Sequence, residues 1–180
     1  MRDFAPIDGV TVIGITGRAR SGKDELARAF LRAVPGAERV AFSDAVAAFA
    51  RATGQMTRRD PRTLQDVGEQ LRRFDVDCWC AAMHGWIEDR RPTLAVVTGL
   101  RHANEYTLIR AMRGYLIGVV RPDAPPVTDR DPLAPVEQGI AAMLDKADVR
   151  FTVPEREHPR ARAALFDGYA AEFVCEWLTD

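Results

Sequence analysis

Short apolar runs alternate with amphipathic segments along most of this chain. Four short runs predict strands, at residues 10–16, 39–43, 94–98 and 115–120, and those at 10–16 and 94–98 have the apolar composition of strands buried in a parallel sheet. A fifth run at 147–153 predicts a final strand. Apolar residues at helical spacing predict helices at 23–34, 45–53, 77–89, 136–145 and 160–178. Two further helices are predicted, one that begins at residue 63 and one that ends at about residue 113. Alternating strands and helices indicate right-handed crossovers and an α/β fold, a mostly parallel sheet flanked by helices on both faces.

Two details of this pattern bear on function. Asp44 follows the second predicted strand, where it can cap the next helix or present a carboxylate at the strand's carboxyl end, towards a nucleotide cleft. The sequence leaves both roles open. Trp79, Met83, Trp86 and Ile87 form an apolar stripe on the helix predicted at 77–89. We interpret this stripe as part of the core, because apolar stripes at helical spacing usually face one.

Residues 17–24, GRARSGKD, join the first predicted strand to the first predicted helix. Gly17 and Gly22 permit backbone angles and close approaches that a Cβ would block. Successive N–H groups and the helix N-terminus can then bind an anion, and Lys23 adds a positive charge for β- and γ-phosphates. Strand, glycine-bounded loop, lysine and helix form the context of a phosphate-binding P-loop. Asp24 stands where that motif has Ser or Thr, and its carboxylate can contact Mg²⁺ directly or through water.

Composition narrows the functional classes. The chain has 180 residues, 47% hydrophobic and 28% charged, which predicts one domain over 1–180 with a sizeable core. A net charge of -1 argues against a large basic surface, so we do not expect a nucleic-acid partner. Lys23 and Lys146 are the only lysines among 25 basic residues, so a lysine-rich composition does not explain a lysine inside the P-loop.

Cysteines, histidines and apolar stretches predict a cytoplasmic protein without a membrane partner. The three cysteines are an odd number, which suits a reducing compartment. Cys78 and Cys80 lie two apart on a predicted helix and cannot face each other, and the three histidines are scattered, so we expect no zinc site. No apolar stretch approaches the 18 or more residues of a membrane span.

The segment at 121–135, RPDAPPVTDRDPLAP, is too rich in proline for a helix or an inner strand. It can be a surface connection, or a lid that brings Arg130 over the transferring phosphates. Long loops without secondary structure are often functional in compact domains. We therefore favour the lid.

The chain resembles the deoxynucleoside monophosphate kinases of bacteriophages, which belong to the P-loop nucleoside monophosphate kinase group. In that family Asp usually follows the P-loop lysine, as Asp24 does here. Further matching segments come in the family's order and span roughly residues 10 to 153: Phe42-Ser43-Asp44, Leu64-Gln65-Asp66-Val67-Gly68-Glu69 with Arg72, Arg73 and Trp79 beyond, 96–105 (VVTGLRHANE), and Val119-Val120-Arg121-Pro122.

The resemblance implies a three-layer P-loop kinase fold and phosphoryl transfer from ATP, with Mg²⁺, to a deoxynucleoside monophosphate. It implies catalytic roles for Lys23, Asp44, Arg101 and Arg130. It assigns the ATP phosphates to Gly17, Arg20, Ser21, Gly22 and Lys23, Mg²⁺ to Asp24, and the acceptor to Asp44, Arg72, Arg73, Trp79, Arg101 and Glu105. For a phage-encoded protein the compartment is the host cytoplasm, and a homodimer is compatible with the resemblance.

Several positions depart from the family pattern. Gly99 stands where the family has an Asp that would act on Mg²⁺, and Ala47 is near the place of a lysine. These departures keep two alternatives open. One is a kinase that phosphorylates a modified base within DNA, and the other is a nucleotide-binding protein that has lost the chemistry.

Overall fold

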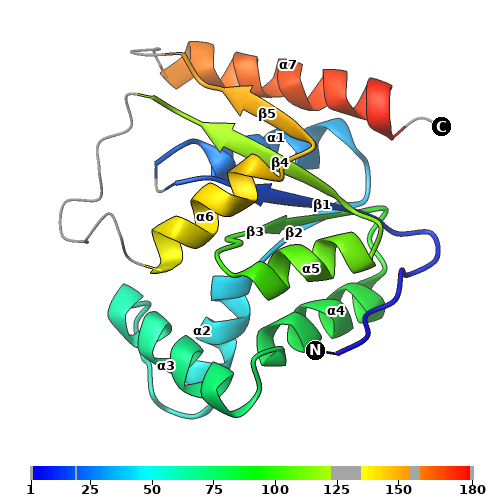
Figure 1. Cartoon of the computed structure of the whole chain (residues 1–180). Coiled ribbons are helices and arrows are strands. Elements are labelled where there is room, and N and C mark those ends of the chain that lie inside the picture. Colours follow the sequence, from blue (N-terminus) through cyan, green and yellow to red (C-terminus); the bar gives the residue numbers. More distant parts are fainter. Residues whose placement is uncertain (1, 19, 123–134, 155–158, 179–180) are drawn as a thin grey trace.

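The structure is a computed structural model that describes residues 2–18, 20–122, 135–154 and 159–178. Its centre is a five-stranded sheet in the order β2-β3-β1-β4-β5, in which every pair of neighbouring strands is parallel (Figure 1). The strands are β1 (Thr11–Thr16), β2 (Ala37–Ala41), β3 (Leu94–Thr98), β4 (Tyr115–Val120) and β5 (Val149–Thr152). All carboxyl ends therefore lie at one edge of the sheet.

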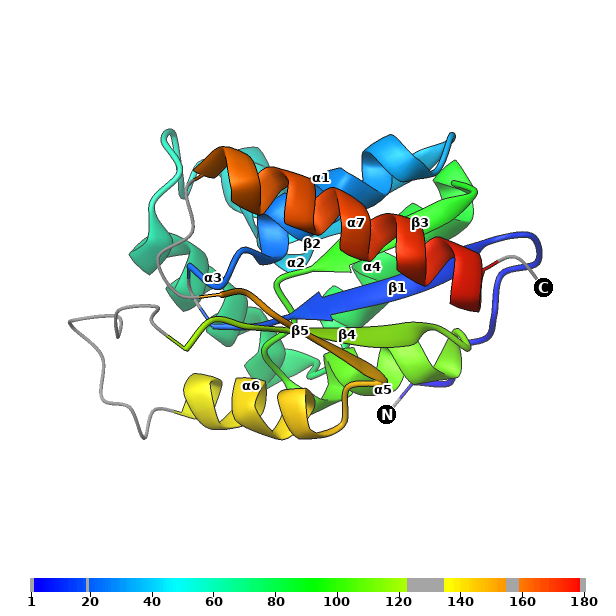
Figure 2. The ribbon, with the colours of Figure 1, turned by 90° about the horizontal axis from the view of Figure 1, so that it is seen from above.

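Helices cover both faces of this sheet. They are α1 (Lys23–Ala33), α2 (Phe42–Ala52), α3 (Pro61–Phe74), α4 (Cys78–Arg90), α5 (Ala103–Ala111), α6 (Pro135–Asp145) and α7 (Pro159–Trp177). Helices α1 and α7 lie together on one face, and α5 and α6 lie on the other (Figure 2). Helices α2 and α3 pack on each other towards the end where the strand arrowheads point (Figure 1). The α/β three-layer fold expected from the alternation is confirmed.

The alternation along the strands explains the two halves of the core. Ile13 and Ile15 pack with α1 and α7, whereas Val12 packs with the helices on the opposite face. Strands buried on both faces need apolar residues at nearly every position, and β3 is buried along its whole length. The sheet is therefore a rigid base for the loops at its carboxyl edge.

The second strand and its helix differ from the prediction. Strand β2 ends at Ala41, and α2 begins at Phe42, whose side chain is buried in the core. The helix N-cap is Ala41, so the capping role considered for Asp44 is wrong. Asp44 lies in the first turn of α2, where a negative charge interacts favourably with the helix dipole.

Of the predicted lid, residues 123–134, Arg130 among them, lie outside the described residues.

Candidate functional site

The P-loop has the backbone geometry that its two glycines predict. Gly17 has φ 157° and Gly22 has φ 100°, and Gly22 is the N-cap of α1. A Cβ at Gly17 would stand 2.6 Å from the carbonyl oxygen of Val119, and one at Gly22 would stand 2.5 Å from the ring of Phe166. Larger residues therefore do not fit at either position. The loop presents the N-terminus of α1, with its amide groups and positive dipole end, at the carboxyl edge of the sheet.

A cleft of about 470 Å³ opens beside the first turn of α1. Its walls are the carboxyl ends of β2 and β3 together with α2 and α3, and its volume lies in the range of small-molecule sites. Charged residues of both signs line it, namely Lys23, Asp24, Arg39, Arg59, Glu69, Arg72, Arg101 and Glu105. The Lys23 side chain is only 21% exposed, and its ammonium lies 3.8 Å from Asp24. The arrangement offers several cations to an anionic ligand.

Four of the charged side chains near the cleft form an exposed chain of ion pairs. Arg39, on β2, lies 3.5 Å from Asp24 and 3.4 Å from Asp44. Arg59 donates to Asp44 at 2.8 Å and to the hydroxyl of Ser43 at 2.8 Å. We call Asp24, Arg39, Asp44 and Arg59 the exposed charge chain. It connects the first turn of α1 with the start of α2 and the segment that leads to α3.

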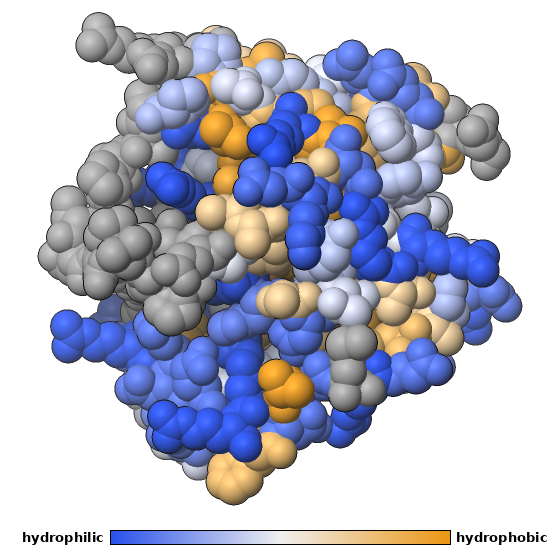
Figure 3. Space-filling model, viewed as in Figure 1, coloured by the Kyte–Doolittle hydropathy of each residue, from blue (hydrophilic) through white to orange (hydrophobic). Residues whose placement is uncertain are grey.

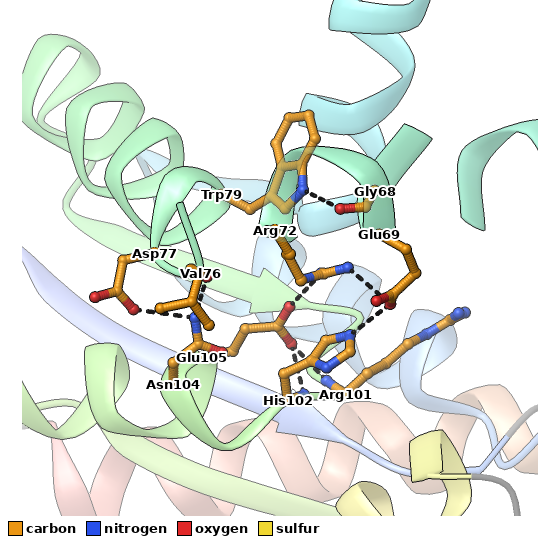
Figure 4. Close-up of polar contacts among 10 residues, drawn as sticks. All are labelled: Gly68, Glu69, Arg72, Val76, Asp77, Trp79, Arg101, His102, Asn104 and Glu105. Atoms are coloured by element: carbon orange, nitrogen blue, oxygen red, sulfur yellow. Dashed lines mark hydrogen bonds and ion pairs between the residues drawn. The ribbon is translucent and has the colours of Figure 1, made fainter. Parts of the chain in front are cut away.

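A buried ion pair also lines the cleft, between α3 and the start of α5 (Figure 4). Glu105 is 1% exposed, and one of its oxygens accepts a hydrogen bond from Arg72 at 3.1 Å. Its other oxygen accepts from the backbone N–H groups of Arg101 at 2.6 Å and His102 at 3.1 Å. Burial raises the pKa of the Glu105 carboxyl, and these donors act in the opposite direction. Glu105 thus joins α3 to the N-terminus of α5, and we call Arg72 and Glu105 the buried pair.

His102 and Glu69 extend this wall towards the cleft. Arg72 also lies 3.3 Å from Glu69, and the His102 ring lies 3.9 Å from the same carboxylate (Figure 4). Burial lowers the pKa of His102, and the nearby Arg72 lowers it further. His102 is therefore a neutral hydrogen-bonding group at neutral pH.

The structure brings most predicted site residues to this cleft, and two lie away from it. Lys23, Asp24, Arg72, Arg101 and Glu105 line it, and Asp44 is linked to it by Arg39 and Arg59. Gly17, Arg20, Ser21 and Gly22 form the P-loop next to it.

Trp79 and Arg73 are not part of the cleft lining. The Trp79 indole is buried in the core and donates to the backbone carbonyl of Gly68 at 3.1 Å. Arg73 is exposed on α3. These positions place Trp79 behind the wall of the cleft rather than on its surface.

Several polar residues of the cleft were not predicted as site residues, among them Arg39, Arg59 and Thr98. Arg39 and Arg59 carried a signal in retrospect, because a charged residue inside an apolar strand run and an arginine in a polar connection both invite a search for partners. Thr98, at the end of β3, carried none, since threonine is common in strands. Its hydroxyl is buried and has no hydrogen-bond partner within the described part of the chain.

The face shown in Figure 3 is largely hydrophilic, with apolar residues in small separate groups among the described residues. None of the helices in the described residues is both long and apolar enough to cross a membrane.

Comparisons with known proteins agree on the fold. The chain aligns with shikimate kinase from Bacteroides thetaiotaomicron at a TM-score of 0.56 and 14% identity, over 91% of this chain and 98% of that one. It aligns with shikimate kinase from Aquifex aeolicus at a TM-score of 0.51 and 14% identity, over 92% and 99% of the two chains. No family model and no curated sequence matches the chain. The chain thus has a P-loop kinase-like fold, which is all that similarity at this identity shows.

Proposed function

We propose that this protein is an ATP-dependent kinase that transfers a phosphoryl group to a deoxynucleoside monophosphate, giving the diphosphate. One observation carries the proposal: the P-loop lysine, Lys23, opens onto the same cleft as Arg101 and the more exposed Arg39 and Arg59. A donor-phosphate site and a set of guanidinium groups for the acceptor phosphate would thus share one cleft. The P-loop kinase-like fold supports phosphoryl transfer, and the resemblance to phage enzymes supports the acceptor.

The residues of the cleft act by position and charge. Phosphoryl transfer requires little covalent chemistry from the protein, and catalysis rests on orientation and on neutralising the charge of the moving group. Lys23 and the amides at the start of α1 hold the β- and γ-phosphates. Arg101, which is exposed and lies just before the first residue of α5, binds the acceptor phosphate in bidentate fashion. The buried pair holds Arg72 still, so that Arg72 shapes the wall rather than moving with the ligand.

The donor set fits Mg²⁺, which P-loop kinases use with ATP. Mg²⁺ prefers oxygen ligands, keeps several waters and binds through one or two carboxylates. Asp24 offers a half-exposed carboxylate beside Lys23, and the unpartnered hydroxyl of Thr98 lines the same cleft. When bound, Mg²⁺ neutralises phosphate charge and orients the phosphate oxygens.

A single panel tests the proposal. Labelled ATP and Mg²⁺ are incubated with each common deoxynucleoside and ribonucleoside monophosphate, with duplex DNA and with shikimate. We expect a labelled diphosphate from at least one deoxynucleoside monophosphate. Transfer only to DNA would favour a base-modifying kinase, and ATP binding without transfer to any acceptor would favour a non-catalytic nucleotide-binding protein.

The chain offers a matched control for the P-loop assignment. Lys23→Ala removes the P-loop cation and should abolish transfer. Lys146→Ala removes the only other lysine, whose ammonium lies over the ring of Tyr106, and should leave transfer intact. Turnover that survives in Lys23→Ala would overturn the assignment.

A further inference from the structure

The hydroxyl of Thr98 is an unexplained polar group beside the P-loop. Thr98 is 1% exposed, and its Oγ1 has no hydrogen-bond partner among the described residues. Buried polar atoms in native proteins nearly always have a partner, because leaving one unpaired costs free energy. Thr98 is also part of the cleft lining, together with Lys23 and Asp24. The hydroxyls of Thr16 and Ser21 are also buried without a partner among the described residues, but of these three only Thr98 is in the cleft lining, where an entering group can reach it.

The register of the sheet directs this hydroxyl towards the first turn of α1. Thr98 pairs with Ile15 of β1 and with Ala41 of β2, at the carboxyl edge of the sheet. Side chains alternate along a strand, and Val96 belongs to the half of the core that α1 covers. Thr98, two residues on, faces the same side. Asp24 lies in the first turn of α1, so both oxygen-bearing side chains face one end of the cleft.

Gly99 leaves the space next to this hydroxyl open. The residue has φ 80°, and a Cβ placed there would have a single heavy atom within 4 Å, the backbone nitrogen of Phe42 at 4.0 Å. A side chain at this position would be strained and would project into the open region. The glycine thus preserves room for a ligand at the end of β3.

We propose that the hydroxyl of Thr98 and the carboxylate of Asp24 together bind the hydrated divalent cation that accompanies the nucleoside triphosphate. This inference rests on the proposed function. A bare phosphate is disfavoured close to Asp24, whereas coordinated water can donate to both the carboxylate and the hydroxyl. A strongly hydrated cation needs only one or two carboxylates, so the site does not require an acidic residue at the position of Gly99.

Substitutions at Thr98 separate a cation site from a structural role. Thr98→Val keeps the shape and removes the hydroxyl, and Thr98→Ser restores the hydroxyl. Replacing an unpaired buried hydroxyl by an apolar group of the same shape should leave the melting temperature of the ligand-free protein unchanged or raise it. Binding is measured with Mn²⁺ by electron paramagnetic resonance in the presence of ATP, and ATP binding is measured separately in EDTA.

We expect the Mn²⁺ affinity of Thr98→Val to fall about tenfold, the size of effect found for partners of metal-bound groups. ATP binding in EDTA should not change, and Thr98→Ser should bind Mn²⁺ like the wild type. Thr107→Val is the matched control, because Thr107 donates to the carbonyl of Ala103 within α5 and is no part of the cleft lining. It should leave the Mn²⁺ affinity unchanged.

The outcomes distinguish this inference from the proposed function. Unchanged Mn²⁺ affinity in Thr98→Val would overturn the cation site while a wild type that binds ATP and Mn²⁺ still supports a kinase. An equal loss of ATP affinity with and without the cation would also overturn it, because the hydroxyl would then contact phosphate. A wild type that binds neither ATP nor Mn²⁺ would instead refute the proposed function.

Discussion

The two groups of ion pairs around the cleft differ in burial, and the difference separates structure from ligand binding. In the buried pair, Glu105 is 1% and Arg72 15% exposed, and Glu105 also accepts two backbone hydrogen bonds. In the exposed charge chain, the side chains are 33% to 50% exposed. Buried charges depend on each other, whereas exposed ones interact weakly through water and salt. Under the proposed function, the exposed charge chain could therefore exchange its partners for phosphate at little cost.

The contrast also revises the role of the arginines. Arg72 has two carboxylate partners, Glu69 and Glu105, and only Glu69 is solvent-exposed. Removing Arg72 from Glu105 would leave a buried carboxylate without its cation. Arg39 and Arg59 carry no such constraint. In the proposed kinase, the positive charge for an incoming phosphate would therefore come from the P-loop side of the cleft and from Arg101, and the buried pair would supply rigidity.

The largest expected effect is on the buried pair. Glu105→Ala leaves the partly buried Arg72 with only the exposed Glu69 as a carboxylate partner and removes the acceptor for two backbone N–H groups at the start of α5. We expect the free energy of unfolding to fall by about 3–5 kcal/mol, measured by urea denaturation. The melting temperature should fall with it.

A conservative variant controls for the loss of packing. Glu105→Gln keeps the size of the side chain and an acceptor oxygen for the backbone, and removes only the charge. It should lose less stability than Glu105→Ala. If Glu105→Ala were within about 1 kcal/mol of the wild type, the range of exposed ion pairs, the distinction between the two groups would fail.

Trp79 tests whether the wall behind the cleft is structural. Trp79→Phe removes the indole hydrogen bond to the carbonyl of Gly68, which lies inside α3 and keeps its place in the helical hydrogen-bond ladder, so we expect a loss of about 0.5–1.5 kcal/mol by urea denaturation. The KM for the acceptor should not change, because the indole does not line the cleft. A raised acceptor KM with unchanged stability would show instead that Trp79 contacts the substrate.

Much of the fold follows from local patterns in the sequence. Strands β1, β3 and β4 match the predicted runs to within one residue, because strands buried on both faces are continuously apolar and end at glycine, proline or a charge. The P-loop was equally visible, since its glycines and lysine lie within eight consecutive residues. Both signals are contained in one short segment.

The charge pairs were not visible, because their partners come from distant segments. Arg72 and Glu105 are 33 residues apart, and Arg59 and Asp44 are 15 apart. Only the packing of α3 against its neighbours decides which carboxylate meets which arginine. The same reasoning explains Asp44. Its suitability as a cap is local, but the burial of Phe42 sets the start of α2 three residues earlier.

We expect substitutions in the exposed charge chain to change ligand binding more than stability, the opposite of substitutions in the buried pair. Arg59→Ala should change the free energy of unfolding by at most about 1 kcal/mol, and the change should shrink in 1 M salt. The acceptor KM should rise roughly tenfold, the equivalent of one charged hydrogen bond. Arg90→Ala is the control, because Arg90 is 61% exposed and pairs with Glu38 outside the cleft lining. A large loss of stability in Arg59→Ala would show that the exposed charge chain stabilises the fold as the buried pair does.

The smallest expected effect is the pH dependence that His102 adds to the buried wall. Burial, and then Arg72, lower its pKa below the ordinary value of 6.5, so the unfolded chain takes up a proton at a higher pH than the folded protein does. Its contribution to stability is therefore complete above pH 6.5 and is lost as the pH falls towards the lower folded pKa. His102→Gln should remove this part of the slope when the free energy of unfolding is measured between pH 7.5 and pH 5.5, ranges chosen to bracket about 6.5. The raised pKa of Glu105 acts with the opposite sign, but it is common to both proteins, so the difference between their slopes reports on His102. Identical slopes would show that the His102 ring is solvated like an exposed residue and that the well-ordered, desolvated wall ends at the buried pair.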